Sequence, residues 1–225
     1  MKATLIGATG LIGSYLLAEL LKDDYFRVVR ILIRRPFELP HPKLEKKMVD
    51  FSDLESFRLA LQDSDVVFCA VGTTQKKVKG DKAAYRKVDY DIPVNAARYC
   101  KMAGCEKFVL VSSAGASSRS INFYAKLKGE VEDAVKAVAR PDAEGGRGLR
   151  SVHILRPSML LGERKEFRLG EKIGKAMMTA LSFLIPAKYK AIHAGKVAKA
   201  MVAASKNDEE GFIIYENKEI RRSGN

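Results

Sequence analysis

The chain has 225 residues, of which 47% are hydrophobic and 30% are charged, a composition typical of a globular protein with a sizeable core. No apolar run reaches the ~18 residues that a membrane span needs, and the start leads directly into a short apolar stretch rather than a signal peptide. Three cysteines without a C-x-x-C pair favour reduced thiols and a cytoplasmic location, and three scattered histidines predict no metal site.

The net charge of +13 has two interpretations. The basic residues can form a solvated surface, or they can surround a site that attracts a polyanionic cofactor. The basic segment 76–87 fits either a lid or a solvated turn. Because no helix-turn-helix, zinc-finger or aromatic RNA-binding pattern accompanies the charge, we expect no nucleic-acid partner.

Short β-branched runs alternate with longer helical patterns along the chain. This alternation predicts parallel strands joined by right-handed crossovers, and therefore an α/β fold with a doubly wound parallel sheet. The expected strands are Ala3–Ile6, Val28–Ile33, Lys47–Val49, Val66–Ala70, Phe108–Val111, Ser151–Leu155 and Phe212–Tyr215. The expected helices between them are Leu11–Lys22, Asp53–Gln62, Ile92–Ala103 and Tyr124–Val138.

The pattern changes from Leu160 onward. Two further helices are expected at Ile173–Leu184 and Ala194–Ser205. We expect one domain over residues 1–225, in which 160–225 form a small helical lobe on the substrate side of the sheet. The apolar face of residues 177–185 would line the pocket or the core, with contact to a membrane or a partner subunit as the alternative.

A glycine-rich turn joins the first strand to the first helix. Its sequence is Gly7-Ala8-Thr9-Gly10-Leu11-Ile12-Gly13. The three glycines suit a tight turn, a close approach of phosphate to the backbone, and close packing of helix on strand. The helix N-terminus would face the anion. Gly7, Thr9, Gly10, Leu11 and Ile12 are therefore candidate residues for a dinucleotide pyrophosphate.

Arg34 and Arg35 follow the second strand, beside the expected position of the adenosine ribose. A guanidinium matches phosphate geometry, so the pair favours NADP(H) over NAD(H), although surface arginines are common at strand ends. Asp50, with Phe51 after it, could accept a hydrogen bond from the adenine amino group or serve as a helix-entry acid.

The fourth strand is followed by Ala70, Val71 and Gly72. Small residues here would let the backbone run beside the cofactor ribose. An ordinary strand-end glycine is the alternative.

The catalytic candidates come after the fifth strand, which ends near Ser112 and Ser113. Tyr124 and Lys128 are four residues apart and would share one helix face. A nearby ammonium favours the phenolate of a tyrosine, whose pKa is otherwise ~10, and brings it toward the range useful for acid–base work. A serine hydroxyl could polarise a substrate carbonyl. Either serine could do so, and we favour Ser113.

Together, the glycine turn, Ser113, Tyr124 and Lys128 resemble the short-chain dehydrogenase/reductase superfamily over roughly residues 3–162. The segment Leu155–Gly162, with Pro157, looks like the part that passes the nicotinamide in epimerase-like members. The segment 88–95 looks like the start of the fourth helix in those members. More narrowly, the segment 69–74, the helix start at Val88-Asp89 and the segment 124–132 resemble atypical members similar to the mammalian Tat-interacting protein. No catalytic asparagine is evident on the fourth helix.

This resemblance implies a Rossmann-like fold, bound NADP(H), and Ser113, Tyr124 and Lys128 in the catalytic positions. Lys128 would also hold the nicotinamide ribose. The expected function is hydride transfer between nicotinamide and a small carbonyl or alcohol substrate. The alternatives are a redox-sensing NADP(H)-binding protein with little turnover, or a nucleotide-sugar epimerase or dehydratase. A homodimer is an expectation from the resemblance alone.

Overall fold

The computed structural model of the protein describes residues 1–74, 78–141, 147–162 and 190–224. At its centre is a seven-stranded sheet with the order β3-β2-β1-β4-β5-β6-β9. Every neighbouring pair in this sheet is parallel, which confirms the predicted doubly wound architecture. The strands are β1 Lys2–Ile6, β2 Val28–Ile33, β3 Leu44–Met48, β4 Val66–Cys69, β5 Lys107–Val111, β6 Ser151–Arg156 and β9 Gly211–Glu216.

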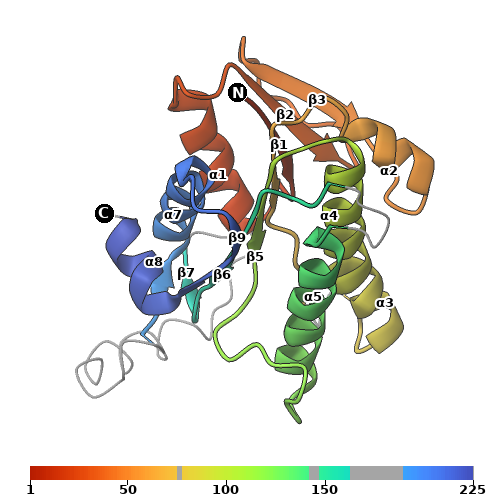
Figure 1. Cartoon of the computed structure of the whole chain (residues 1–225), viewed down its shortest axis with the longest axis vertical. Coiled ribbons are helices and arrows are strands. Elements are labelled where there is room, and N and C mark those ends of the chain that lie inside the picture. Colours follow the sequence, from red (N-terminus) through yellow and green to blue (C-terminus); the bar gives the residue numbers. More distant parts are fainter. Residues whose placement is uncertain (75–77, 142–146, 163–189, 225) are drawn as a thin grey trace.

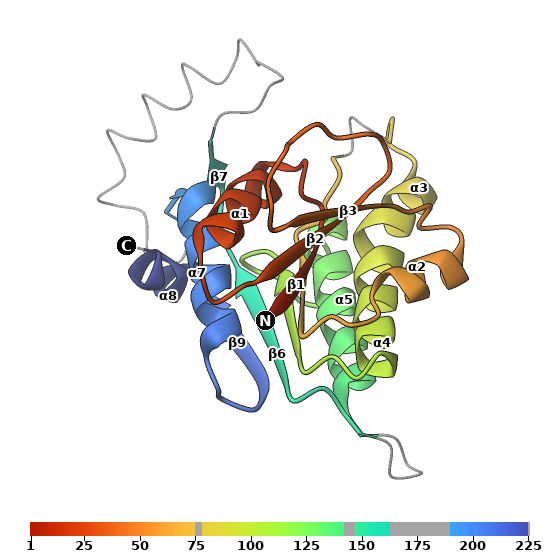
Figure 2. The same ribbon diagram turned by 90° about the horizontal axis from the view of Figure 1, so that it is seen from above.

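Helices cover both faces of the sheet (Figures 1 and 2). One face carries α1 Leu11–Lys22, α7 Ala194–Lys206 and α8 Asn217–Ser223. The other carries α2 Leu54–Ala60, α3 Lys82–Arg86, α4 Ile92–Met102 and α5 Phe123–Ala139. The result is a three-layer Rossmann-like fold.

Each face of the sheet has its own hydrophobic core. Alternate residues of a strand point to opposite faces, so Leu5 packs with α1 and α7 while its neighbour Ile6 packs with α2 and α4. Both side chains are fully buried. Burial on both faces explains why the central strands read as continuous apolar runs.

The helix predicted to begin at Ile92 belongs to a longer helical segment. The segment starts with α3, whose N-cap Asp81 accepts hydrogen bonds from the amides of Ala83 and Ala84. It passes through a π-helical turn, η1, at Lys87–Asp91 and continues as α4. Pro93 has no N–H to donate to the carbonyl of Asp89, so the regular α-helical pattern is interrupted at this turn.

The described C-terminal residues join the main body of the domain. A short ladder pairs β7 Leu160–Leu161 with β8 Ile192–His193, α7 packs against α1, and β9 extends the sheet beside β6. The predicted helix Ile173–Leu184 lies outside the described residues. Within the described ranges, no helix is both long enough and apolar enough to cross a membrane.

Candidate active site

The glycine turn after β1 brings the backbone against the end of β4. Gly7 has a φ of +92°, and a Cβ there would lie 2.7 Å from the Ala70 carbonyl oxygen. A Cβ at Gly13 would lie 2.0 Å from the Gly7 carbonyl oxygen. Only glycine allows both contacts. The turn is closed by a hydrogen bond of 2.9 Å from the Gly10 amide to the Gly7 carbonyl.

Helix α1 begins at this turn with Gly10 as its N-cap, and no side chain in the described parts of the chain caps it. The amides of Leu11, Ile12 and Gly13 precede the first hydrogen-bonded position of the helix, which is occupied by Ser14. They can therefore donate to an anion, with the helix dipole in support. The Ile12 side chain is buried in the core, so only its backbone is available, whereas Thr9 is exposed.

Arg34 and Arg35 lie exposed directly after β2. Strand β2 pairs in parallel with β1, and Ile6 is opposite Leu32. The two arginines therefore leave the sheet at the edge where the glycine turn begins. A different arginine on this strand, Arg30, is buried and binds Glu45, so it belongs to the structure of the sheet.

The acid after β3 has local partners. Asp50 Oδ1 accepts hydrogen bonds from the amide and the hydroxyl of Ser52, at 2.9 and 2.7 Å, and these bonds lower the pKa of the Asp50 carboxyl. The carboxylate itself is exposed. Phe51 packs edge-on against Phe57 with ring centroids 4.8 Å apart. Asp50 thus organises the entry to α2 while its carboxylate faces solvent.

The loop after β4 runs between the glycine turn and η1. The Ala70 amide donates to the Ile6 carbonyl, Val71 is half-buried, and Gly72 is exposed. The Thr73 amide donates to Asp89 Oδ2 at 2.7 Å, and the Tyr85 hydroxyl donates to the Thr73 carbonyl at 3.2 Å. This loop is therefore fastened at both ends.

The two serines after β5 have different surroundings. The Ser112 hydroxyl is buried and donates to Glu132 on α5, which also binds Arg156 at the end of β6. Ser113 is partly exposed, and among the described residues its hydroxyl reaches only the carbonyl of Ala114, at 3.4 Å. Ser113 is thus the serine with a hydroxyl available to a ligand.

Tyr124 and Lys128 lie on one face of α5, as their spacing predicts. The Lys128 ammonium is 5.9 Å from the centroid of the Tyr124 ring. Tyr124 is 39% exposed, whereas Lys128 is 4% exposed and forms an ion pair of 2.9 Å with Asp89. Burial acts to lower the pKa of Lys128, but the charges of Asp89 and Tyr124 outweigh it, so the pKa is raised.

Close packing holds the loop after β5 against α5. A Cβ at Gly129 would lie 2.1 Å from the Ser118 amide nitrogen, and the Ser117 amide donates to the Ala125 carbonyl at 3.0 Å. Pro157, buried after β6, accepts a hydrogen bond of 2.9 Å from the Ala114 amide. The loop after β5, which carries Ser112 and Ser113, is thereby fixed between β6 and α5.

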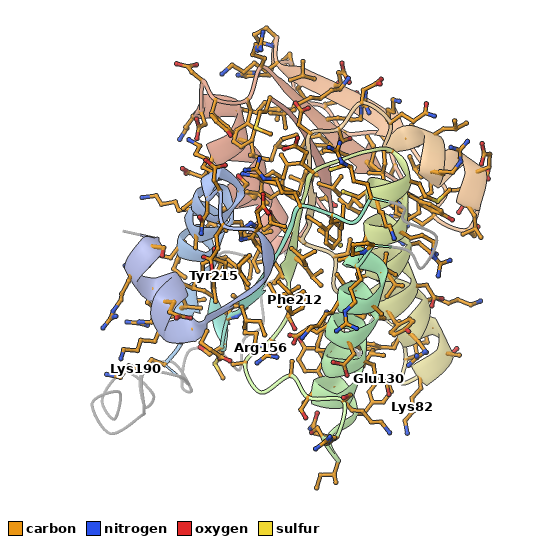
Figure 3. The ribbon with its side chains drawn as sticks, viewed as in Figure 1. Lys82, Glu130, Arg156, Lys190, Phe212 and Tyr215 are labelled. Carbon is orange, nitrogen blue, oxygen red and sulfur yellow. The ribbon has the colours of Figure 1, made fainter. Side chains whose placement is uncertain are left out.

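Three charged residues near the candidate site were not among the candidates predicted from the sequence: Asp89, Glu132 and Arg156. Glu132 lies one turn beyond Lys128, so a stripe of residues at i, i+4 and i+8 along α5 could have indicated it. Arg156 bridges Glu132 and Glu216 at the end of β9, and Figure 3 shows it between α5 and the C-terminal elements. Asp89 belongs to a segment noted only for its resemblance to a helix start.

Comparison with known proteins agrees with this geometry. A family model described as NAD(P)H-binding matches residues 7–208. Protein HTATIP2 of Rattus norvegicus is 31% identical over 224 residues, which cover 98% of this chain and 88% of that protein. The protein FMP52, mitochondrial, of Meyerozyma guilliermondii is 39% identical over 166 residues, covering 73% of this chain and 67% of that protein.

Solved structures share the fold. MoeE5 in complex with UDP-glucose and NAD has a TM-score of 0.73 at 22% identity, over 95% of this chain and 75% of that chain. UDP-glucose 4-epimerase from Thermotoga maritima has a TM-score of 0.70 at 17% identity, over 96% of this chain and 77% of that chain. The protein is therefore a member of the NAD(P)H-binding family of Rossmann-like proteins and a homologue of HTATIP2 and FMP52.

Proposed function

We propose that the protein is an NADP(H)-dependent oxidoreductase that transfers hydride between the nicotinamide and a small carbonyl or alcohol substrate. The observation that carries this proposal is the Tyr124–Lys128 pair on α5. Its ammonium is charged, buried and 5.9 Å from the centroid of the tyrosine ring, on a helix whose Glu132 binds Ser112 after β5 and Arg156 at the end of β6. The same edge of the sheet carries the glycine turn of an NAD(P)H-binding domain.

The residues present fit a dinucleotide. The backbone amides of Leu11 and Ile12 would hold the pyrophosphate, with Thr9 beside them. Gly7 and Gly10 carry no Cβ, so the phosphates can approach these amides closely. When bound, the cofactor supplies or accepts the hydride. Ala70, Val71, Gly72 and Pro157 would line its path toward the nicotinamide, since they follow β4 and β6 at the same edge.

The acid–base work would fall to three side chains. Tyr124 would donate a proton from its phenol oxygen to the carbonyl oxygen during reduction, and take one back during oxidation. Lys128 would favour the phenolate through its charge and bind the ribose hydroxyls. Ser113 would donate a hydrogen bond to the same carbonyl oxygen and stabilise its developing negative charge.

Arg34 and Arg35 support the preference for NADP(H) over NAD(H). Both are exposed at the end of β2, and a guanidinium can bind a 2′-phosphate through two parallel hydrogen bonds. A carboxylate at this position would instead favour the 2′-hydroxyl of NAD(H). Asp50 and Phe51, after β3, would lie toward the adenine.

The buried cysteines bear on the cellular compartment of the protein. The thiols of Cys69, Cys100 and Cys105 are free and buried, which supports a reducing compartment, and we propose the cytoplasm. The FMP52 relatives carry the word mitochondrial in their names, so fractionation of the native cells should test both compartments. We further propose a homodimer, which light scattering of the purified chain tests directly.

The test of function is a screen of aldehydes and ketones with NADPH, followed at 340 nm. The wild-type protein should oxidise NADPH with at least one carbonyl class, and Tyr124→Phe should lower that rate by about 100-fold or more. Tyr25→Phe, an exposed tyrosine on the loop before β2, serves as the matched control and should retain the rate. NADPH binding without turnover on any carbonyl would favour the redox-sensing alternative.

A further inference from the structure

Asp89 makes two contacts from a buried position. It is 1% exposed, its Oδ1 lies 2.9 Å from the Lys128 ammonium, and its Oδ2 accepts the Thr73 amide hydrogen at 2.7 Å. A Cβ built at Gly72 would lie 3.7 Å from the same Oδ1. One carboxylate therefore joins the catalytic helix α5 to the loop after β4.

The surroundings of Lys128 make a counter-ion necessary. A lysine so deeply buried loses its proton readily unless a charge or several hydrogen bonds compensate for lost hydration. The titratable groups around it are Asp89 on η1, Tyr124 on α5 and Cys69 on β4. Asp89 contributes the largest effect that raises the pKa of Lys128. Burial raises the pKa of Cys69 to about 12, so this thiol is neutral and provides no charge at ordinary pH.

The π-turn accounts for the position of Asp89. The wider turn at Lys87–Asp91 lies between α3 and α4, and its carboxylate reaches α5 from there. Tyr85, one turn earlier, donates to the Thr73 carbonyl. The amide and the carbonyl of Thr73 are therefore both hydrogen-bonded to side chains of this helical segment. Burial, together with the charge of Asp89, raises the pKa of the Tyr85 phenol, which keeps this hydroxyl a donor.

We propose that Asp89 is the positioning residue of the site: it keeps Lys128 charged beside Tyr124 and couples that pair to the loop after β4. Its catalytic meaning rests on the proposed oxidoreductase function. The charge pair itself can be tested without cofactor or substrate.

The experiment is a spectrophotometric titration of tyrosine ionisation near 295 nm. The chain has eight tyrosines and no tryptophan, so the phenolate signal is unobstructed. Subtracting the curve of Tyr124→Phe isolates Tyr124. The variants are Asp89→Asn, Lys128→Met and the double variant, with Glu132→Gln as the matched control, because it removes a buried carboxylate of α5 that binds Arg156 and Ser112.

Lys128→Met should raise the pH midpoint of Tyr124 ionisation by about one unit, because a nearby positive charge is lost. Asp89→Asn should also raise it, but by less, since an unpaired buried lysine is neutral in the alkaline range where tyrosines titrate and the negative charge of Asp89 is lost with it. The double variant should match Asp89→Asn, because in this pH range neither variant carries a charge at positions 89 and 128, whereas Lys128→Met keeps the charge of Asp89. Glu132→Gln should leave the midpoint in place.

The proposal is overturned if Asp89→Asn leaves the Tyr124 midpoint unchanged or lowers it, since Lys128 would then hold its charge alone. It is equally overturned if Asp89→Asn raises the midpoint further when Lys128 is already methionine, since Asp89 would then favour the phenolate without Lys128. Should Asp89→Asn fail to fold, thermal unfolding decides: the double variant should unfold at a higher temperature than Lys128→Met, and a lower temperature contradicts the pairing.

Cofactor titration separates this proposal from the proposed function. Asp89 meets Lys128 with one oxygen and Thr73 with the other, and asparagine replaces one of these oxygens with an NH2 donor, so Asp89→Asn should weaken NADPH binding about fivefold or more by releasing the loop after β4. Unchanged NADPH affinity would remove the coupling to that loop. A wild-type protein that binds neither NADPH nor NADH would overturn the proposed function, while the tyrosine titration would still decide the role of Asp89.

Discussion

The buried hydroxyl of Ser112 donates a hydrogen bond to the Glu132 carboxylate on α5. Glu132 in turn receives two hydrogen bonds from Arg156, which also binds Glu216. This network fastens β5, β6, α5 and the end of β9 to one another. Because Ser112 is used inside it, the adjacent Ser113 is the serine left to face a ligand.

The two serines should therefore behave differently on replacement by alanine. Ser113→Ala should lower turnover by about 100-fold through loss of a donor to the developing oxyanion, with little change in stability. Ser112→Ala should lower the free energy of unfolding by ~1–3 kcal/mol, because a buried carboxylate loses a donor. Turnover and urea denaturation of both variants check this prediction. Equal loss of turnover in both would contradict the assignment.

Removing the two arginines after β2 should change cofactor selectivity. Arg34→Ala combined with Arg35→Ala should weaken NADPH binding about tenfold or more and NADH binding about twofold or less, because only NADPH carries the 2′-phosphate. Fluorescence titration of both cofactors measures the two affinities. Lys218→Ala with Arg222→Ala, two exposed residues of α8, removes the same charge and controls for general electrostatic attraction. Equal losses for NADPH and NADH would count against a 2′-phosphate site.

Two glycines with nearly the same φ angle allow backbone strain to be compared with cofactor binding. Gly7 and Gly211 have φ values of +92° and +96°, but a Cβ at Gly7 meets the Ala70 carbonyl, whereas one at Gly211 meets no atom of the described residues within 4 Å. Both alanine variants should lose about 1–2 kcal/mol of stability from the conformation alone. Gly7→Ala should lose more because of the clash, and should also lose most of its NADPH affinity. Urea denaturation and cofactor titration measure both effects, and equal behaviour would contradict the role of the turn.

The chain should lose stability in mild acid through His153. This side chain is fully buried between Ser151 and Tyr215, and burial together with Lys107 lowers its pKa from 6.5 to about 4. The unfolded chain therefore takes up this proton first as pH falls. Stability from this group is complete above about pH 6.5 and is lost toward pH 4, at no more than ~1.4 kcal/mol per pH unit.

The matched variant for that prediction is His153→Gln, which can keep hydrogen bonds to both neighbours without titrating. Urea denaturation between pH 4 and 7 should give a shallower pH dependence for the variant than for the wild type. Parallel curves would show that His153 makes no contribution to the acid sensitivity.

Strongly periodic elements could be predicted from the sequence. Helix α1 was predicted at Leu11–Lys22 and has those bounds, because its apolar residues recur on one face that packs against α7. The third strand was predicted at Lys47–Val49 but spans Leu44–Met48. It lies at the edge of the sheet, where Glu45 pairs with Arg30 of β2 at 3.0 Å, so its pattern is too polar to mark its start.

The helical segment before Ile92 could not be predicted in the same way. The predicted boundary at Ile92 falls where the structure continues back through a π-turn to a further helix. Asp89 lies on that turn, and its partners Thr73 and Lys128 come from two other elements. A contact among three separate segments leaves no local pattern, which is why Asp89 was found only in the structure.

We propose that this chain binds NADP(H) in the site formed by the glycine turn and the arginine pair. Calorimetric titration of the purified protein with NADPH and, separately, with NADH tests it most directly. We predict tight binding of NADPH and at least tenfold weaker binding of NADH, because the 2′-phosphate adds a charge-assisted contact. Absence of binding by either cofactor would contradict the account.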